Sequence, residues 1–173
     1  MNQRFTKAPR VLSLYPTTRG FGFAVFEGPS SVIDWGVQQV RSGDRSDQLS
    51  RMRSLIEWNA PDVLILENCG GQSSRRVLRI HKEIQAVARL AKRRRIPIAS
   101  YSRAMIRQCF SRFDAKSKDA IARVIAREFP ELEPRLPPLR RPWMSEDYRM
   151  GMFDAAALAL THFYFASIRG ETE

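Results

Sequence analysis

The sequence is short of cysteine, of long apolar runs and of acidic residues, and each shortage excludes a class of protein. Only two of the 173 residues are cysteines, Cys69 and Cys109, and they need not pair. We therefore expect a reducing compartment rather than a disulfide-stabilised secreted domain. No apolar run approaches the roughly 18 residues of a membrane-spanning helix. The first ten residues are basic and lack the apolar segment of a signal peptide, so a cytoplasmic protein without a membrane segment is predicted.

The shortage of acids gives the chain a strongly positive charge. Its 29 lysines and arginines outnumber its 18 aspartates and glutamates, which leaves a net charge of +11. A charge of this size favours a polyanionic partner, and nucleic acid is the first candidate. The alternative is a basic soluble protein without such a partner. The length and an apolar fraction of 43% predict one globular domain over residues 1–173.

The stretch Pro61–Asn68 is the point around which the rest of the sequence is organised. Its four consecutive aliphatic residues, 63–66, are typical of a short strand that is buried on both faces of a mainly parallel sheet. Glu67 follows at the carboxyl end of this strand, where open α/β sheets place their ligand sites. The alternative is that Glu67 is simply the first polar residue after a core strand.

Three apolar runs precede this strand, at residues 10–16, 21–26 and 32–40, and short polar turns separate them. Runs joined in this way predict an antiparallel meander. Side chains alternate along a strand, so Val11, Ser13 and Tyr15 should share one face of the first run. Tyr15 then ends this strand just before its turn.

Helical spacing of apolar residues begins after the meander. Ser46 or Asp47 is the expected N-cap of a helix that ends before Pro61. Ser73 or Ser74 is the expected N-cap of a second helix that reaches about Arg94. The apolar residues at helical spacing in these two segments are Leu49, Met52, Leu55, Ile56, Val77, Ile80, Ile84, Val87 and Leu90.

A strand at residues 96–101 and three further helices complete the predicted order. The helices are expected at residues 103–110, at 116–129 and from about Ser145 onward. Asp154 lies within the last helix and is followed by three alanines, which let a neighbouring backbone approach closely. A buried aspartate at this position needs a partner, a metal ion or a proton. The alternative is an exposed aspartate on the helix surface.

Three antiparallel strands followed by alternating strands and helices are typical of the ribonuclease H-like fold. Four segments of the sequence resemble, in order, motifs of the RuvC family of Holliday junction resolvases. These segments are the first hairpin at 11–22, the acidic strand at 61–68, the lysine-bearing helix start at 115–118 and the acidic last helix at 153–159. The resemblance implies an α/β protein in which helices cover both faces of a five-stranded mixed sheet.

The resemblance extends to the catalytic residues only in part. The family cuts DNA with four carboxylates that hold two Mg²⁺ or Mn²⁺ ions. Glu67 and Asp154 match two of these carboxylates, whereas Tyr15 and Gly151 stand at the other two positions. A phenol is a poor ligand for a hard cation and glycine offers no side-chain oxygen, so the resemblance implies at most one weakly bound Mg²⁺ or Mn²⁺. Asp147 could substitute only if the last helix includes it, and about 10.5 Å of helix would separate it from Asp154.

The resemblance also suggests how the chain contacts DNA. The family carries an aromatic wedge in the loop after the acidic strand, but residues 69–74 include no aromatic residue. Lys116 would lie near the scissile phosphate, and the alternative is an exposed lysine in the first helical turn. The candidate phosphate-binding residues are Arg75, Arg76, Arg79, Lys82, Lys116 and Lys118.

Two functions from different classes remain open at this point. The first is a DNA-binding protein with a depleted nuclease site, which would recognise duplex DNA or a four-way junction as a homodimer or within a larger recombination complex. The second is a metal-dependent endodeoxyribonuclease that uses Glu67, Asp154 and a relocated or partner-supplied carboxylate. The small number of matching carboxylates favours the first function.

Overall fold

The computed structural model describes residues 7–40, 44–70 and 75–170, with the side chains of residues 75–77 left out. Five strands form one mixed sheet in the order β3-β2-β1-β4-β5. The strands are β1 (Arg10–Thr17), β2 (Gly20–Glu27), β3 (Val32–Gln39), β4 (Val63–Glu67) and β5 (Ile98–Tyr101). The first three are antiparallel to one another, and β4 and β5 run parallel to β1. The predicted five-stranded mixed sheet is confirmed.

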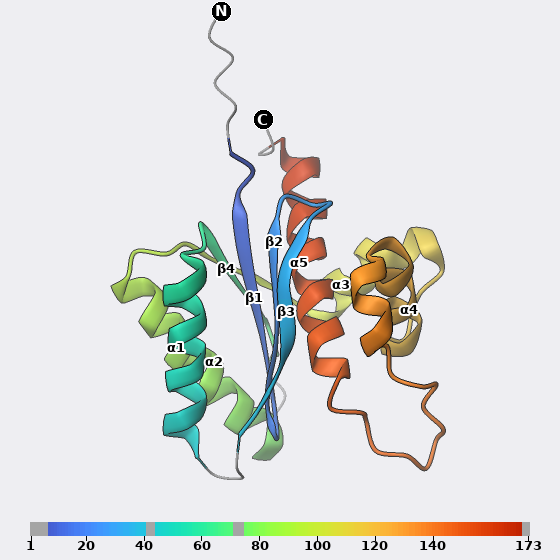
Figure 1. Cartoon of the computed structure of the whole chain (residues 1–173), viewed down its shortest axis with the longest axis horizontal. Coiled ribbons are helices and arrows are strands. Elements are labelled where there is room, and N and C mark those ends of the chain that lie inside the picture. Colours follow the sequence, from blue (N-terminus) through green and yellow to red (C-terminus); the bar gives the residue numbers. More distant parts are fainter. Residues whose placement is uncertain (1–6, 41–43, 71–74, 171–173) are drawn as a thin grey trace, which may run out of the picture.

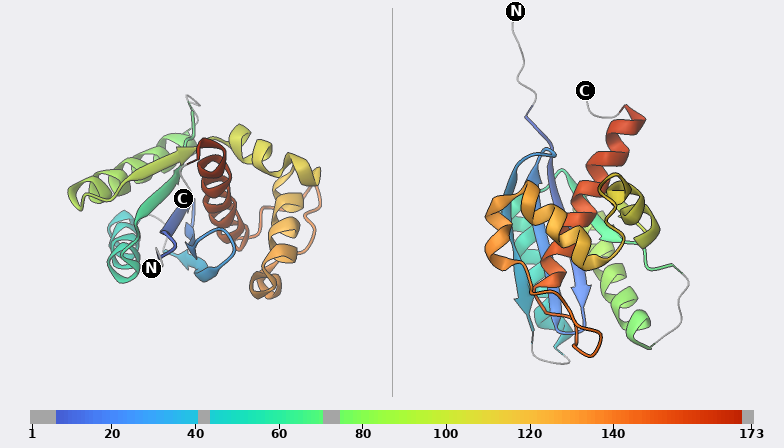
Figure 2. Two further views of the ribbon diagram at one scale, coloured as in Figure 1. Left: turned by 90° about the horizontal axis from the view of Figure 1, so that it is seen from above. Right: turned by 90° about the vertical axis from the view of Figure 1, so that its right-hand side faces the viewer.

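Helices cover both faces of this sheet (Figures 1 and 2). On one face lie α1 (Arg45–Asn59) and α2 (Arg75–Arg93). On the other lie α3 (Arg103–Phe110), α4 (Lys118–Glu128) and α5 (Met150–Arg169). Two short 3₁₀ helices, η1 (Ser111–Phe113) and η2 (Pro130–Arg135), flank α4. None of the helices in the described ranges is long and apolar enough to cross a membrane.

The alternation of side chains along β1 divides the core into two layers. Leu12 and Leu14 are buried against α1 and α2, where Met52 and Ile56 meet them. Residues 11, 13 and 15 face the opposite layer with α5, as the sequence predicted. Each face of the strand therefore contributes to a separate apolar cluster, and the sheet lies between the two.

Close packing of α5 fixes its first turns against the β1–β2 hairpin. A Cβ atom added to Gly22 would lie 2.0 Å from the carbonyl carbon of Gly151, so only glycine fits at this contact. One turn later, the Ser13 hydroxyl donates a hydrogen bond of 2.5 Å to the Ala155 carbonyl. These two contacts hold Asp154, which lies between them in sequence, over the end of β1.

Three predicted helix starts differ from the structure, and one of them is the start of α4, which begins at Lys118 rather than at residue 116. The last helix begins at Met150, not near Ser145, because the preceding acids bind side chains of their own: the Asp147 carboxylate accepts hydrogen bonds from the Arg149 side chain at 2.7 and 3.0 Å. Asp147 therefore lies outside α5. In α1 the N-cap is Asp44 rather than Ser46 or Asp47, since its carboxylate accepts the Asp47 backbone N–H at 2.9 Å. The expected caps Ser73 and Ser74 lie outside the described residues.

Candidate functional site

Side chains from five separate elements meet at the carboxyl ends of β1 and β4. The parallel register pairs Leu14 with Leu66, so the next residues, Tyr15 and Glu67, lie side by side. Glu67 ends β4, whereas Tyr15 does not end its strand as predicted, because β1 stays paired with β2 as far as Thr17. The Arg103 Nη2 atom lies 3.1 Å from the Tyr15 hydroxyl, 3.1 Å from Asp154 Oδ1 and 3.9 Å from Glu67 Oε1. Three residues singled out in the sequence, Tyr15, Glu67 and Asp154, thus lie around one guanidinium group. We use the name acid–cation cluster for five residues: Tyr15, Glu67, Arg103, Lys118 and Asp154.

Both carboxylate oxygens of Asp154 accept hydrogen bonds from cations. Arg103 donates to Oδ1, and Lys118 Nζ donates to Oδ2 at 2.8 Å. The Asp154 side chain is only 4% exposed, so these bonds replace the water that its charge has lost. The buried aspartate expected from the alanine-rich sequence is therefore partnered by two side chains of this chain.

The helix starts of α3 and α4 aim the two cations at Asp154. Arg103 is the first residue of α3, and Ser102 alone separates it from β5; the Ser102 hydroxyl caps this helix by accepting the Met105 N–H. Lys118 is likewise the first residue of α4, capped by Ser117. Both helices begin at the edge of the sheet where β1 and β4 end, so both first residues reach the same point.

Tyr15 connects the acids and the cations. Its hydroxyl oxygen accepts hydrogen bonds from Arg103 at 3.1 Å and from Lys118 at 3.4 Å. Its ring lies 5.2 Å from Lys118 Nζ and 5.9 Å from the Arg103 guanidinium carbon, within the range of cation–π attraction. A phenol at this position therefore binds cations from both its oxygen and its ring face.

The shifts of pKa in the acid–cation cluster follow from burial and from these contacts. Burial raises the pKa of Glu67, with Arg103 and a hydrogen bond from Tyr15 opposing it. Burial also raises the pKa of Asp154, against the opposing effect of Lys118 and Arg103. Burial acts to lower the pKa of Lys118, but the Asp154 carboxylate outweighs it and the pKa rises. The Tyr15 pKa is raised by burial and by Asp154, so the phenol stays protonated at neutral pH.

The structure separates Lys116 from the cluster. Its side chain is 86% exposed and lies 3.5 Å from the Asp114 carboxylate, two residues before α4 begins. Lys118 reaches the buried acids instead. Glu146 lies 3.0 Å from Lys118 and is an additional acid next to the cluster, whereas Asp147 binds Arg149.

The remaining basic candidates lie along α2. Lys82 is exposed, and Arg79 lies 3.9 Å from Glu83. Arg75 and Arg76 begin the helix, but their side chains lie outside the described residues. Whether these four residues bind phosphates remains a prediction.

Sequence reasoning missed Arg103. The signal that could have found it is its position, since it lies two residues after the end of β5 and so begins a helix at the same edge of the sheet as Glu67. An arginine there reaches any acid at the neighbouring strand ends.

A divalent ion does not fit the cluster as the side chains stand. Both oxygens of Asp154 already bind cations, and the ammonium of Lys118 would repel a second positive charge placed beside it. Within the described ranges, no group of three or more His, Cys, Asp or Glu side chains is arranged to hold a metal ion. Glycine at 151 and a protonated phenol at 15 add no charged ligand.

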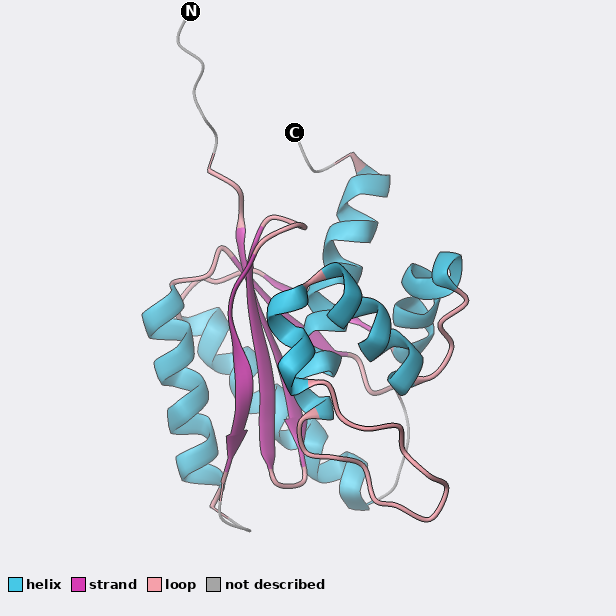
Figure 3. Ribbon diagram, turned by 45° about the vertical axis from the view of Figure 1, so that its right-hand side comes forward, coloured by secondary structure: helices cyan, strands magenta, loops and turns pink. Residues whose placement is uncertain are grey.

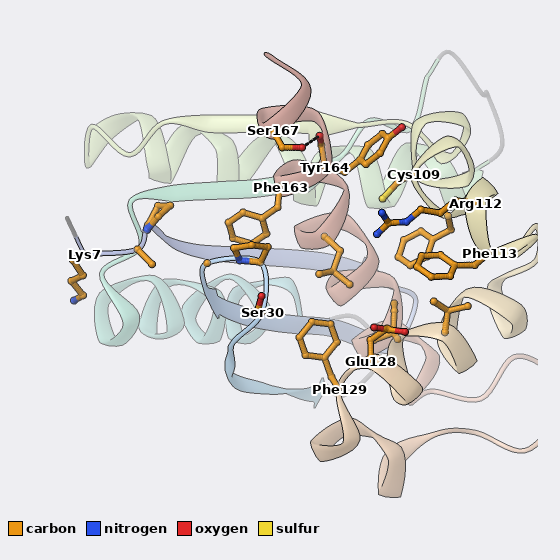
Figure 4. A pocket seen from close by; sticks show the side chains of 18 residues that line it. Lys7, Ser30, Cys109, Arg112, Phe113, Glu128, Phe129, Phe163, Tyr164 and Ser167 are labelled. Carbon is orange, nitrogen blue, oxygen red and sulfur yellow. Dashed lines mark hydrogen bonds between the residues drawn. The ribbon is translucent and has the colours of Figure 1, made fainter. Parts of the chain in front are cut away.

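A cavity of about 890 Å³ lies elsewhere, beside the carboxyl-terminal half of α5 (Figure 4). Phe163 and Tyr164 of α5 line it together with Phe129 and the turn between β2 and β3. No member of the acid–cation cluster contributes to its lining. The largely apolar cavity is therefore separate from the acids.

No protein-family model matches the sequence, and no curated protein matches it. Among solved structures, the chain is similar to Thermus thermophilus RuvC in complex with a Holliday junction substrate, at 16% identity, with 92% of this chain and 96% of that chain covered and a TM-score of 0.68. It is also similar to the yeast mitochondrial Holliday junction resolvase Ydc2, at 16% identity, 98% and 85% coverage and a TM-score of 0.63. A Fowlpox virus resolvase in complex with Holliday junction DNA matches at 15% identity, 92% and 98% coverage and a TM-score of 0.52. The chain therefore has the ribonuclease H-like fold of the RuvC-type Holliday junction resolvases, which confirms the resemblance predicted from its motifs.

Proposed function

We propose that this chain binds branched DNA, including four-way junctions, and does not cleave it. The observation that carries the proposal is the pair of hydrogen bonds from Arg103 and Lys118 to the two oxygens of Asp154. These cations neutralise the buried acids at the place where the resolvase resemblance implies metal ions. The fold is kept, and the metal-dependent chemistry is lost.

The binding half of the proposal rests on charge and fold together. The net charge is +11, and exposed lysines such as Lys82 and Lys116 are available for phosphates. Two of the solved structures with this fold are resolvases in complex with junction DNA. Phosphate contacts give affinity without reading sequence, so we expect the shape of the DNA to decide the preference.

The second half of the proposal, that the chain does not cleave DNA, rests on the requirements of two-metal hydrolysis. Two ions roughly 4 Å apart must stabilise the attacking and the leaving oxygen. Glu67 and Asp154 are the two acids at the expected positions, and both lie within 4 Å of the Arg103 guanidinium. The side chains of Arg103 and Lys118 cannot activate a water molecule as a metal ion does, because neither lowers the pKa of a directly bound water.

The alternative is a metal-dependent endonuclease with a relocated acid, and Glu146 is the specific observation in its favour. Glu146 and Asp154 both bind Lys118, at 3.0 and 2.8 Å. If Lys118 left this position when DNA bound, Glu67, Asp154 and Glu146 could face one ion. The cleavage experiment below separates the two functions.

Binding is tested by fluorescence anisotropy with a labelled immobile four-way junction and a duplex of the same arm sequence. We expect tighter binding to the junction. For roughly six phosphate contacts on duplex DNA, the slope of log K against log salt is expected near −5. Absence of binding at low salt, or a flat salt titration, would contradict the binding half.

Cleavage is tested with the same junction in Mg²⁺ and in Mn²⁺, with protein in excess over DNA so that one turnover suffices. We expect intact junction, with or without either ion. The control variant is Glu67→Gln, which removes one acid and retains the shape of the side chain. Strand cleavage by the wild type that disappears in Glu67→Gln would overturn the proposal that the chain does not cleave DNA and would establish the alternative, a metal-dependent endonuclease.

A further inference from the structure

Residues 136–149 form an irregular loop between η2 and α5, which we call the pre-α5 loop (Figures 1 and 3). Its two acids bind cations at the base of the loop: Glu146 contacts Lys118 of the acid–cation cluster, and Asp147 contacts Arg149. The loop is therefore attached at the edge of the sheet where the candidate site lies. Figure 3 shows its outer part extending away from the helices.

A turn gives the tip of this loop a defined shape. The Met144 N–H donates a hydrogen bond of 2.9 Å to the Arg141 carbonyl, which closes a four-residue turn with Pro142 in its second position. Proline is favoured at that position because its ring fixes φ near the value the turn requires. The Arg140 side chain then donates a hydrogen bond of 2.7 Å to the Met144 carbonyl. Trp143, the third residue of the turn, is held at the tip.

The indole of Trp143 is exposed to solvent beside the Arg141 cation. Trp143 as a whole residue is 76% exposed. The Arg141 guanidinium carbon lies 5.6 Å from the ring centroid, within the range of cation–π attraction, and most of the residue stays exposed to solvent. Among the described residues, neither Arg140 nor Arg141 forms an ion pair with a carboxylate. The tip therefore offers an open aromatic face with positive charge around it.

These features fit one chemical partner. A nucleobase stacks on an aromatic face, and the phosphates on either side of it bind arginine. Bases inside a duplex are stacked on one another, so only an unstacked base can reach the indole. We propose that Trp143 stacks on an unstacked nucleobase while Arg141 contacts a neighbouring phosphate. Such a base occurs at the branch point of a junction or in a single strand.

Charge disfavours a second copy of the chain as the partner of this tip. Two identical tips would bring the exposed arginines 140 and 141 of both copies together, and like charges across an interface are repulsive. The inference rests on the proposed function in that it takes DNA as the partner. It goes further by naming the residue that reads the branch.

The test compares Trp143→Ala with Trp58→Ala. Trp58 is a matched control because it is 85% exposed but lies in the last turn of α1, which packs on the other face of the sheet. Anisotropy titrations use three probes: the four-way junction, a single strand and a closed hairpin duplex. We expect Trp143→Ala to bind the junction, the single strand or both about 10-fold more weakly. Duplex binding should change less than about twofold, Trp143→Phe should restore most of the affinity, and Trp58→Ala should match the wild type.

A second readout reports stacking directly. 2-Aminopurine placed at the branch point should lose fluorescence when wild type binds, and should keep it with Trp143→Ala. Equal binding of all three probes by wild type and Trp143→Ala would overturn the inference, as would an equal loss on all three. A change in sedimentation of Trp143→Ala without a change in DNA affinity would also overturn it, in favour of a contact between copies. Wild type that bound no probe would overturn the proposed function, and the inference with it.

Discussion

Replacing Lys118 by methionine removes one of the two cations on Asp154 and keeps a side chain of similar length. Asp154 is 4% exposed and would retain only the Arg103 hydrogen bond at Oδ1, which leaves Oδ2 without its 2.8 Å partner. Removing one member of a buried ion pair costs about 3–5 kcal/mol. Lys118 is partly exposed, so water reaches this side of the cluster and the lower end of that range applies. We expect Lys118→Met to lower the free energy of unfolding by about 3 kcal/mol.

Lys116→Met is the matched control. It is the same substitution two residues away, on a side chain that is 86% exposed, and should change the free energy of unfolding by less than about 0.5 kcal/mol. Both variants and the wild type are compared by equilibrium urea denaturation, followed by far-UV circular dichroism at pH 7. Equal slopes with a shifted midpoint mean that stability alone has changed.

A double-mutant cycle with Asp154→Asn assigns the loss to the pair. If Lys118 stabilises the fold chiefly through Asp154, the double variant should be more stable than the sum of the two single losses predicts, by at least about 1 kcal/mol. A Lys118→Met protein within 0.5 kcal/mol of wild type, or strictly additive losses, would refute the reasoning that this lysine neutralises a buried charge.

Three further predictions concern the neighbourhood of the cluster. Burial and the Glu67 carboxylate, 3.9 Å away, raise the pKa of the Cys69 thiol to about 11. Alkylation of Cys69 by iodoacetamide should therefore be slow at neutral pH and faster in Glu67→Gln. Equal alkylation rates in both proteins would contradict the effect of Glu67 on the thiol. Burial raises the pKa of the Glu67 carboxyl, so the folded state binds the carboxyl proton more tightly than the unfolded chain does. This contribution to stability is present below about pH 4.5 and is lost as the pH rises through the pKa of the folded state. The free energy of unfolding of Glu67→Gln in urea, relative to wild type, should therefore rise over this pH range rather than fall. Gly22→Ala would place a methyl group 2.0 Å from the Gly151 carbonyl carbon and should lower the free energy of unfolding, measured by thermal denaturation, by about 3 kcal/mol. Gly36→Ala, whose methyl group meets only the Phe23 ring at 3.1 Å, should lower it less. Equal losses in the two variants would contradict the backbone contact.

Local patterns predicted the parts of the site that belong to regular elements. Alternation along β1 put Tyr15 on the face of Ser13, although the strand continues two residues further than predicted, to Thr17. The run of aliphatic residues before Glu67 put that acid at the end of the neighbouring strand. The alanines after Asp154 indicated close helix packing, which the Ser13–Ala155 hydrogen bond provides. These features depend on periodicity and on residue size, both of which are visible in a single sequence.

The cations of the site could not be predicted in the same way. Arg103 and Lys118 are two among 29 basic residues, and although each stands at a helix start, nothing in the sequence shows that both side chains bind Asp154. What selects them is the position of two helix starts relative to Asp154, which depends on how α3 and α4 pack against α5. The start of α5 is a similar case, because ion pairs of Glu146 and Asp147 hold the preceding residues in the loop.

The central claim is that Arg103 and Lys118 neutralise the acids in place of a divalent ion. Mn²⁺ titration of the junction-bound protein, followed by electron paramagnetic resonance of the free ion, tests it most directly. As a positive control, Tyr15→Asp with Lys118→Ala exchanges a phenol for a carboxylate and removes one cation, and should gain a Mn²⁺ site. For the wild type we predict the same Mn²⁺ binding as for Glu67→Gln. A Mn²⁺ ion that binds the wild type and is lost in Glu67→Gln would contradict the claim.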